Sequence, residues 1–292
     1  MHHPLPRTAG AADAAPALAR RIGLLRAAAA VEPRIDGVLL YGSWTVGEAD
    51  AYSDIEAYVF LRDDSFPGGD GLPGGDGARD FDGTEFLRRL GELRLAYTNM
   101  FGTLAVVFDD LMRGEFHFEP AGPGIEKVAS WEGMVHLPDP EAAVLLDRGG
   151  RLTPVARRLA DLGPPEPGPT ARRLTAELAN WTLMLAHVLA RGETARAHAL
   201  LHTMVAPQQL RLCRLLRGST AHWLTPSRAL EGDLPEADVR RYAATTAPAE
   251  PAAVRAAARA SWAWSRELAA EAASRWGLEL PRELHEDIAQ LL

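Results

Sequence analysis

Two apolar runs separated by a polar segment stand out near the beginning of the chain. The first run, 38–41, stops at Gly42 and Ser43, and the second starts around Asp54 and Glu56. Side chains two residues apart on a strand point to the same face. The pattern therefore predicts two strands joined by a polar connection, with a pair of carboxylates next to a glycine turn.

The pattern of the remaining first half predicts an α/β (α+β) domain with a mixed sheet of about five strands. Segments rich in proline and glycine, such as 63–80, are expected to be surface loops. Apolar positions at helical spacing predict an amphipathic helix over 83–97. The expected helices are 14–31 and 83–97, and the expected strands are 37–41, 52–61, 103–108, 112–118 and 142–147.

A proline-rich stretch, 163–170, separates two regions of different pattern. Proline is excluded from helix interiors and central strands, so this stretch is expected to divide the chain into domains 1–163 and 164–292. Beyond it the apolar positions follow the helical period, which predicts an all-α bundle. The expected helices are 170–191, 193–217, 235–247 and 251–276, with a turn at Gly192 between the first two.

The predicted strand 112–118 brings a third acid into the first domain, because Arg113, Glu115 and His117 alternate with apolar residues there. A carboxylate near the centre of a domain is costly to bury without a compensating cation. Neighbouring carboxylates such as Asp54 and Glu56 also repel each other unless a cation lies between them. Hard oxygen ligands suit Mg²⁺ that carries a nucleotide's phosphates, and the N–H groups of the Gly-Ser turn can hold those phosphates.

Composition restricts the partners. The 292 residues are 47% apolar and 24% charged, which is a globular mixture long enough for two cores. The net charge of −8 disfavours nucleic acid, which is normally held by a basic face. No apolar stretch reaches the ~20 residues that a membrane span needs. A single cysteine, Cys213, and an N-terminus without a signal-like apolar segment favour a cytoplasmic protein.

Four segments carry a resemblance to a known family. They are YGSWTVGEADAYSDIEAYVFL, FGTLAVVFDDLMRGEFHF and, more weakly, RGETAR and YAATTA in the helical half. The glycine turn, the two spaced acids and the third acid resemble the nucleotidyltransferase superfamily of the DNA polymerase β type. Within it, the segments resemble the lincosamide nucleotidyltransferases of the LinB kind. The resemblance implies a nucleotidyltransferase domain, a helical substrate-side and dimerisation domain, and a homodimer.

The resemblance also implies a reaction and its residues. A nucleoside monophosphate, AMP from ATP or that of another NTP, would be transferred to a hydroxyl of a small antibiotic, most simply a lincosamide. Mg²⁺, as two ions, would be held by Asp54, Glu56 and Glu115, with Glu115 as general base. Gly42, Ser43 and Thr45 would contact the triphosphate. The family more often has a lysine where this chain has Val46, so a positive contact must come from elsewhere, for example from Arg113.

Several residues and the acceptor remain open to two interpretations. Arg113 contacts phosphate or only pairs with Glu115 or Asp110. Trp44 stacks on a base or substrate ring, or it caps the core. His117 contacts substrate or is a hydrogen-bonded core histidine. The acceptor is a lincosamide or, alternatively, an aminoglycoside, a biosynthetic intermediate or a protein hydroxyl, as in antitoxin-like enzymes. A strongly acidic pocket favours an aminoglycoside and a more apolar one a lincosamide.

Overall fold

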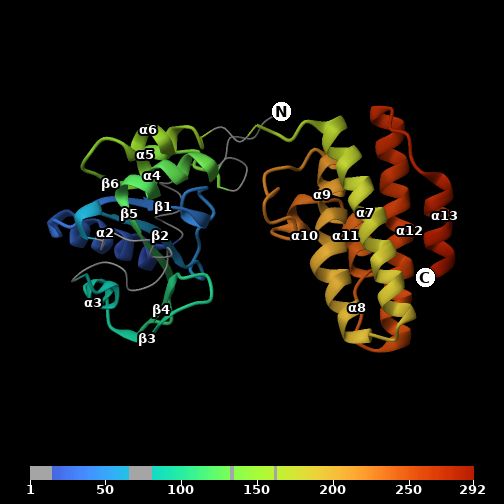
Figure 1. The fold of residues 1–292 in the computed structure, drawn as a ribbon, viewed down its shortest axis with the longest axis horizontal. Coiled ribbons are helices and arrows are strands. Elements are labelled where there is room, and N and C mark those ends of the chain that lie inside the picture. Colours follow the sequence, from blue (N-terminus) through green and yellow to red (C-terminus); the bar gives the residue numbers. More distant parts are fainter. Residues whose placement is uncertain (1–14, 66–80, 132–134, 161–162) are drawn as a thin grey trace. The chain divides into compact units, whose positions relative to one another are not determined.

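The computed structural model describes residues 15–65, 81–131, 135–160 and 163–292. Contacts within the chain divide it into two compact units, Met1–Leu162 and Gly163–Leu292. The first unit contains strands and helices, and the described part of the second contains helices (Figure 1). None of the described helices is long and apolar enough to cross a membrane.

Six strands in the described part of the first unit form one sheet in the order β3-β4-β5-β2-β1-β6. The pair β2 and β5 is parallel, and the other neighbours are antiparallel, so the sheet is mixed as predicted. It has one strand more than the five expected. The strands are β1 Ile35–Leu40, β2 Ile55–Leu61, β3 Leu93–Thr98, β4 Leu104–Phe108, β5 Arg113–Pro120 and β6 Val144–Asp147.

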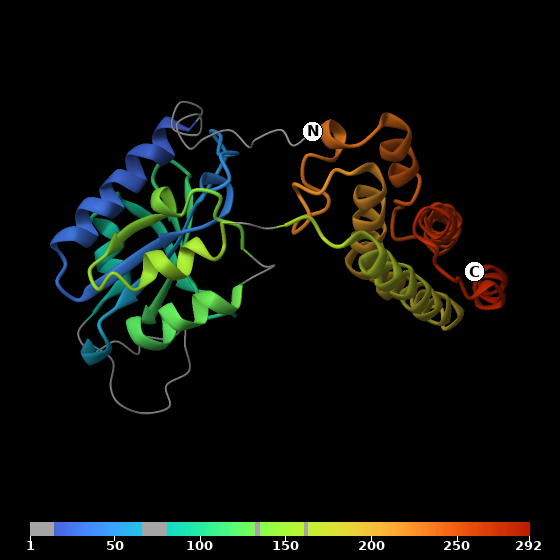
Figure 2. The same ribbon diagram turned by 90° about the horizontal axis from the view of Figure 1, so that it is seen from above.

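Helices cover both faces of this sheet, as the two views show (Figures 1 and 2). The helix α2 packs on one face through Leu18, Ile22 and Leu25, which share a core with the inward side chains of β1 and β2. On the other face, α4 and α6 pack against Leu39 and Phe60. The helices of this unit are α2 Pro16–Val31, α3 Gly83–Arg88, α4 Ala121–Val128, α5 Pro140–Ala143 and α6 Leu152–Arg157.

The predicted helix over 83–97 is wrong in its second half, because the chain forms α3 and then the additional strand β3. Gly91 lies between them with φ +157, and a Cβ on it would lie 2.8 Å from Nη1 of Arg21. The backbone therefore approaches a buried side chain at a position that only glycine permits. After this break Leu93 and Ala96 of β3 pack against the core, with a shift in strand register between Leu93 and Leu95. Pairing with β4 overrides the helical spacing.

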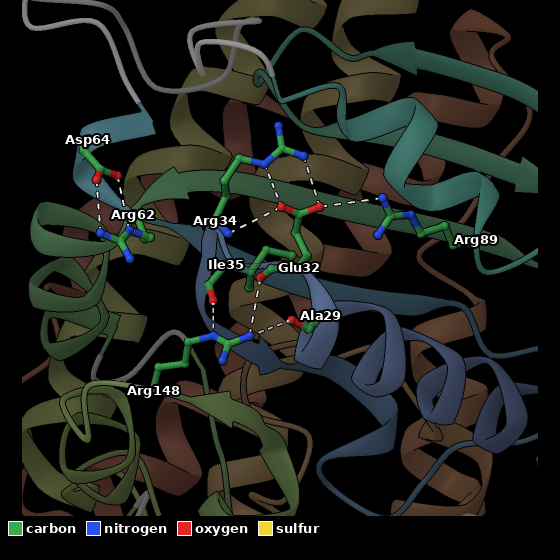
Figure 3. Close-up of polar contacts among 8 residues, drawn as sticks. All are labelled: Ala29, Glu32, Arg34, Ile35, Arg62, Asp64, Arg89 and Arg148. Carbon is green, nitrogen blue, oxygen red and sulfur yellow. Dashed lines mark hydrogen bonds and ion pairs between the residues drawn. The ribbon is translucent and has the colours of Figure 1, made fainter.

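A dense polar network fixes the end of α2 to the sheet (Figure 3). Arg148, which follows β6, donates to the carbonyl oxygens of Ala30 at 2.7 Å and Ile35 at 2.8 Å. The bond to Ala30 satisfies a carbonyl that α2 leaves without a partner at its C-terminus, and the bond to Ile35 ties the same side chain to the start of β1. Nearby, the buried Glu32 pairs with Arg34 at 2.6 Å, and this hydrogen bond holds the pKa of Glu32 below its ordinary value. The role of this network is therefore structural: it holds the end of α2 against the sheet.

The second unit is helical in every segment where helices were expected, with two differences. One is the presence of two additional helices, the short α10 before the third expected helix and α13 after the last. The other is a π-helical turn, Leu201–Val205, that interrupts the predicted helix 193–217. Pro207 has no N–H to donate to Thr203 and its ring would clash there, so a wider turn relieves the conflict. The helices are α7 Pro167–Ala190, α8 Thr194–Leu200, α9 Ala206–Arg217, α10 Leu230–Asp233, α11 Glu236–Ala243, α12 Pro251–Trp276 and α13 Arg282–Leu291.

Candidate active site

The parallel pair β2 and β5 brings the predicted acids to one end of the sheet. Glu56 is the direct partner of Glu115, and Tyr58 is the direct partner of His117. Directly paired residues on neighbouring strands point to the same face. Asp54 immediately precedes β2, because this strand begins at Ile55 and not at residue 52 as predicted. The alternation expected from the sequence therefore places Glu56 and Glu115 side by side on one face of the sheet, and we call these two residues and Asp54 the polar row.

Arg113 links two of the three acids. Its Nη1 lies 3.4 Å from Oδ2 of Asp54, and its Nη2 lies 3.0 Å from Oε1 of Glu115. The side chain of Arg113 is 61% exposed, whereas those of Asp54 and Glu115 are 29% and 31% exposed. Asp110, the other partner considered for Arg113, instead pairs with the buried Arg21 at 2.7 Å. Arg113 thus lies at the centre of the acidic end of the sheet.

The predicted glycine turn follows β1 directly. Gly42 has φ +77, and a Cβ on it would collide with the carboxylate of Glu56. The Thr45 hydroxyl donates to the Gly42 carbonyl at 2.9 Å and so fixes the turn. The Ser43 hydroxyl is buried and has no hydrogen-bond partner among the described residues. The turn therefore holds an unsatisfied polar atom beside the acids.

His117 is held in an aromatic cluster. Its Nε2 lies 3.2 Å from the Tyr41 hydroxyl, and its ring stacks on Tyr58 with centroids 4.1 Å apart. Burial, together with the positive charge of Lys127, lowers the pKa of His117 to about 4. His117 is therefore a neutral, hydrogen-bonded histidine at neutral pH, as in one of its two interpretations. Trp44 packs against the core that α2 covers, which matches its use as a cap.

Tyr41 is a site residue that the sequence analysis did not single out. Burial raises the pKa of its hydroxyl, and the charges of Glu56, Glu115 and Asp54 raise it further. The Tyr41 hydroxyl thus interacts electrostatically with all three acids. It remains protonated at neutral pH and can donate a hydrogen bond. Its place at the end of an apolar run, directly before Gly42, was the available signal in the sequence.

The acids fit a divalent cation by their chemistry. Three carboxylates, those of Asp54, Glu56 and Glu115, come together at adjoining strand ends, and a guanidinium already lies between two of them. Hard carboxylate oxygens are the ligands that Mg²⁺ prefers. Within the described ranges, no group of three or more His, Cys, Asp and Glu side chains is arranged to hold a metal ion. These acids would therefore bind a cation only after their side chains move, with Arg113 released from at least one of them.

A mixed α/β sheet followed by a helical unit is the architecture that the resemblance to nucleotidyltransferases implied. Residues 169–291 match the family model for the C-terminal domain of lincosamide nucleotidyltransferase-like proteins. The helical unit is therefore a LinB-like C-terminal domain. This match confirms the suspected family through a part of the chain that lies outside the acidic motifs.

Other comparisons are weaker. No curated protein matches the chain significantly. An aminoglycoside 6-adenyltransferase from Bacillus subtilis is similar with 12% identity and a TM-score of 0.41, covering 94% of this chain and 95% of its own. A nucleotidyltransferase-like protein from Exiguobacterium sibiricum 255-15 is similar with 14% identity and a TM-score of 0.33, covering 87% of this chain and 76% of its own. At these values neither likeness decides the fold or the substrate.

Proposed function

We propose that the chain transfers a nucleoside monophosphate to a hydroxyl of a small antibiotic. The proposed donor is ATP, which supplies AMP, and the proposed acceptor is a lincosamide. The observation that carries the proposal is the direct pairing of Glu56 with Glu115 beside the Gly42 turn. A third acid, Asp54, is linked to Glu115 through Arg113. Acids and a phosphate-holding turn at one end of a sheet are the two parts that this reaction needs.

In this reaction the acceptor oxygen attacks the α-phosphorus of the nucleotide. The bond between the α-phosphorus and the oxygen bridging to the β-phosphorus breaks, pyrophosphate leaves, and the hydroxyl proton passes to Glu115. Bound Mg²⁺ would stabilise the negative charge on the entering and leaving oxygens. Asp54, Glu56 and Glu115 would hold it. Glu115 suits the base because its side chain is 31% exposed, so an acceptor can reach it.

The nucleotide's phosphates would lie at the Gly42 turn. Ser43 supports this position with its buried hydroxyl, which has no hydrogen-bond partner in the described part of the chain. The Thr45 hydroxyl donates a hydrogen bond to the Gly42 carbonyl, so this side chain would shape the turn. The backbone of Thr45 would contact the phosphates. Arg113 would supply the positive contact that a lysine at position 46 gives in other members. It would move from Asp54 to a phosphate oxygen when the nucleotide binds.

An aminoglycoside is the second candidate acceptor. The supporting observation is the excess of acids: Arg113 is one cation beside Asp54, Glu56 and Glu115, and a polycation would be attracted to such a site. The resemblance also suggests a homodimer, and the negative net charge of −8 disfavours a nucleic-acid partner.

The decisive experiment incubates the protein with Mg²⁺, each of the four NTPs and a panel of lincosamides, aminoglycosides and other hydroxylated antibiotics. Mass spectrometry then shows which compound gains the mass of a nucleoside monophosphate. The expected product is an adenylylated lincosamide together with pyrophosphate. Modification of an aminoglycoside alone would make the aminoglycoside the acceptor in place of the lincosamide. The absence of any product with all four NTPs would refute the proposed reaction.

A further inference from the structure

The row of residues that contains Glu56 and Glu115 continues across the sheet to its edge. Glu115 pairs with Ala105 on β4, and Ala105 pairs with Tyr97 on β3. Tyr97, Ala105, Glu115 and Glu56 therefore lie in one line on one face of the sheet. Strands are spaced by about 4.8 Å, so the Cα of Tyr97 lies roughly 10 Å from that of Glu115.

A second line runs beside the first. Leu95 on β3 pairs with Val107 on β4, and Val107 pairs with Arg113 on β5. Leu95 is 49% exposed and Tyr97 is 52% exposed. We call the four residues Leu95, Tyr97, Ala105 and Val107 the hairpin platform. Ala105 is buried and Val107 is half-buried, so the exposed apolar and aromatic part of the platform lies on β3, with β4 between it and the acids.

We propose that the hairpin platform binds the apolar or ring part of the acceptor and so presents an acceptor hydroxyl to Glu115. This inference rests on the proposed function and names the acceptor side of the same site. Tyr97 offers a ring face for stacking, and Leu95 extends the contact along the strand. The distance from Tyr97 to Glu115 matches a small molecule that covers one and reaches the other.

The chemistry of the platform favours one class of acceptor. An apolar surface gains free energy by covering apolar groups, and it offers nothing to ammonium groups beyond the face of one tyrosine. The platform therefore selects a hydroxylated molecule with an apolar half, such as a lincosamide, over a polycationic aminoglycoside.

The position of the platform also argues for a small molecule over a second copy of the chain. A stable protein interface buries about 800 Å² on each partner, which takes about 20–30 residues. The platform has two strongly exposed side chains, Leu95 and Tyr97, and it ends at the acids. An occupant that uses both the apolar surface and the acids is smaller than a protein domain.

The test compares Tyr97→Ala, Tyr97→Phe and Thr98→Ala with the wild type in steady-state kinetics with a lincosamide and ATP. Thr98 is the matched control, because it is exposed on the same strand and pairs with Leu104 on the opposite face. Tyr97→Ala is expected to raise the KM for the lincosamide roughly tenfold or more while the KM for ATP stays unchanged. Tyr97→Phe should restore most of the affinity, because it keeps the ring. An unchanged lincosamide KM in Tyr97→Ala would overturn the proposal while leaving the transferase function intact.

Two further measurements keep the inference separate from the proposed function. If the wild type transfers no nucleotide to any acceptor, saturation-transfer NMR with lincomycin still tests the platform. A signal that Tyr97→Ala removes and Thr98→Ala retains supports it, and no signal with the wild type refutes it. Sedimentation velocity tests the other occupant. If Tyr97→Ala converts an oligomer into a monomer, the surface is an interface between copies and the acceptor assignment is wrong.

Discussion

Arg113 at the acidic end of the sheet and Arg214 inside the helical unit contact carboxylates in different surroundings. Arg214 is fully buried and pairs with one acid, Asp233, at 2.7 Å. Its other donors go to the carbonyl oxygens of Pro226 at 2.8 Å and Arg228 at 2.5 Å, and to Ser219. Arg113 is 61% exposed and contacts two carboxylates, those of Asp54 and Glu115.

The difference separates a structural arginine from a functional one. A buried charge is retained only when its partners satisfy it, so the Arg214 contacts fix the chain between α9 and α11. At the acidic end of the sheet the arginine is exposed, so it can leave its carboxylates when a cation with its nucleotide is attracted to the acids. Loss of a charge should therefore affect turnover at the first place and folding at the second.

The largest effect is expected at Glu115. Glu115→Gln keeps the shape of the side chain but removes the proton acceptor, so kcat should fall about 10²- to 10⁴-fold. The midpoint of thermal unfolding should stay the same or rise, because a like charge beside Glu56 disappears. Glu119→Gln, on the same strand and face, is the matched control and should retain turnover. A Glu115→Gln enzyme with normal kcat would assign the base to another residue.

The next largest effect is expected at Arg214. Arg214→Met removes the buried member of the pair with Asp233 and leaves the carbonyl oxygens of Pro226 and Arg228 without their donor. Asp233 itself is 23% exposed and keeps its contact to His222, so the loss should lie near the lower end of the roughly 3–5 kcal/mol of unfolding free energy that breaking a buried pair costs. Urea unfolding followed by tryptophan fluorescence measures the loss. Arg211→Met is the control, because Arg211 lies on the same helix and makes one long bond of 3.4 Å to Trp223. Equal losses in both variants would mean that Arg214 contributes only by packing.

The sequence predicted those parts of the fold that depend on neighbours along the chain. The apolar runs that became β1 and β2, the acids of the polar row, and the helices of the second unit follow local alternation or the helical period. The suspected family was confirmed through the match of residues 169–291. The roles of Asp54, Glu56 and Glu115 remain predictions, although the structure brings these residues to one end of the sheet.

The remaining features depend on contacts between distant segments. The strand β3 was hidden because its apolar positions also fit a helix, and only pairing with β4 decides between them. The direct pairing of Glu56 with Glu115 depends on the register of two strands about 60 residues apart, which no local pattern encodes. The position of Tyr97 on the same row follows from two such registers, so the acceptor side could not be predicted.

A smaller effect is expected at Arg113. Arg113→Gln should weaken binding of Mg²⁺ with a non-hydrolysable ATP analogue roughly tenfold, because a charge-assisted contact to phosphate is lost. The unfolding free energy should change by less than about 1 kcal/mol, since Arg113 is mostly exposed. Isothermal titration calorimetry measures the first quantity and urea unfolding the second. Unchanged nucleotide affinity would limit Arg113 to balancing the charges of Asp54 and Glu115.

The smallest effect is expected on the pH dependence of stability, from a buried histidine in the helical unit that lacks one hydrogen-bond partner. His285 on α13 is 6% exposed, and its Nε2 has no hydrogen-bond partner in the described ranges. Its ring meets the edge of Trp262 with centroids 5.1 Å apart. Burial, and then the charge of Arg266, lower the pKa of His285 below its ordinary value.

The unfolded chain therefore binds a proton on His285 at a higher pH than the folded chain does. The stability that this group contributes is present above about pH 6.5 and is lost as the pH falls toward its folded pKa. Thermal unfolding between pH 7.5 and 5.5 should show this decline, and His285→Gln should flatten it. His187→Gln, at an exposed position on α7, should leave the slope as it is. If the slope of stability against pH stays equally steep in both variants, the loss of stability in acid comes from groups other than His285. Burial of the His285 ring would then cost the folded state little.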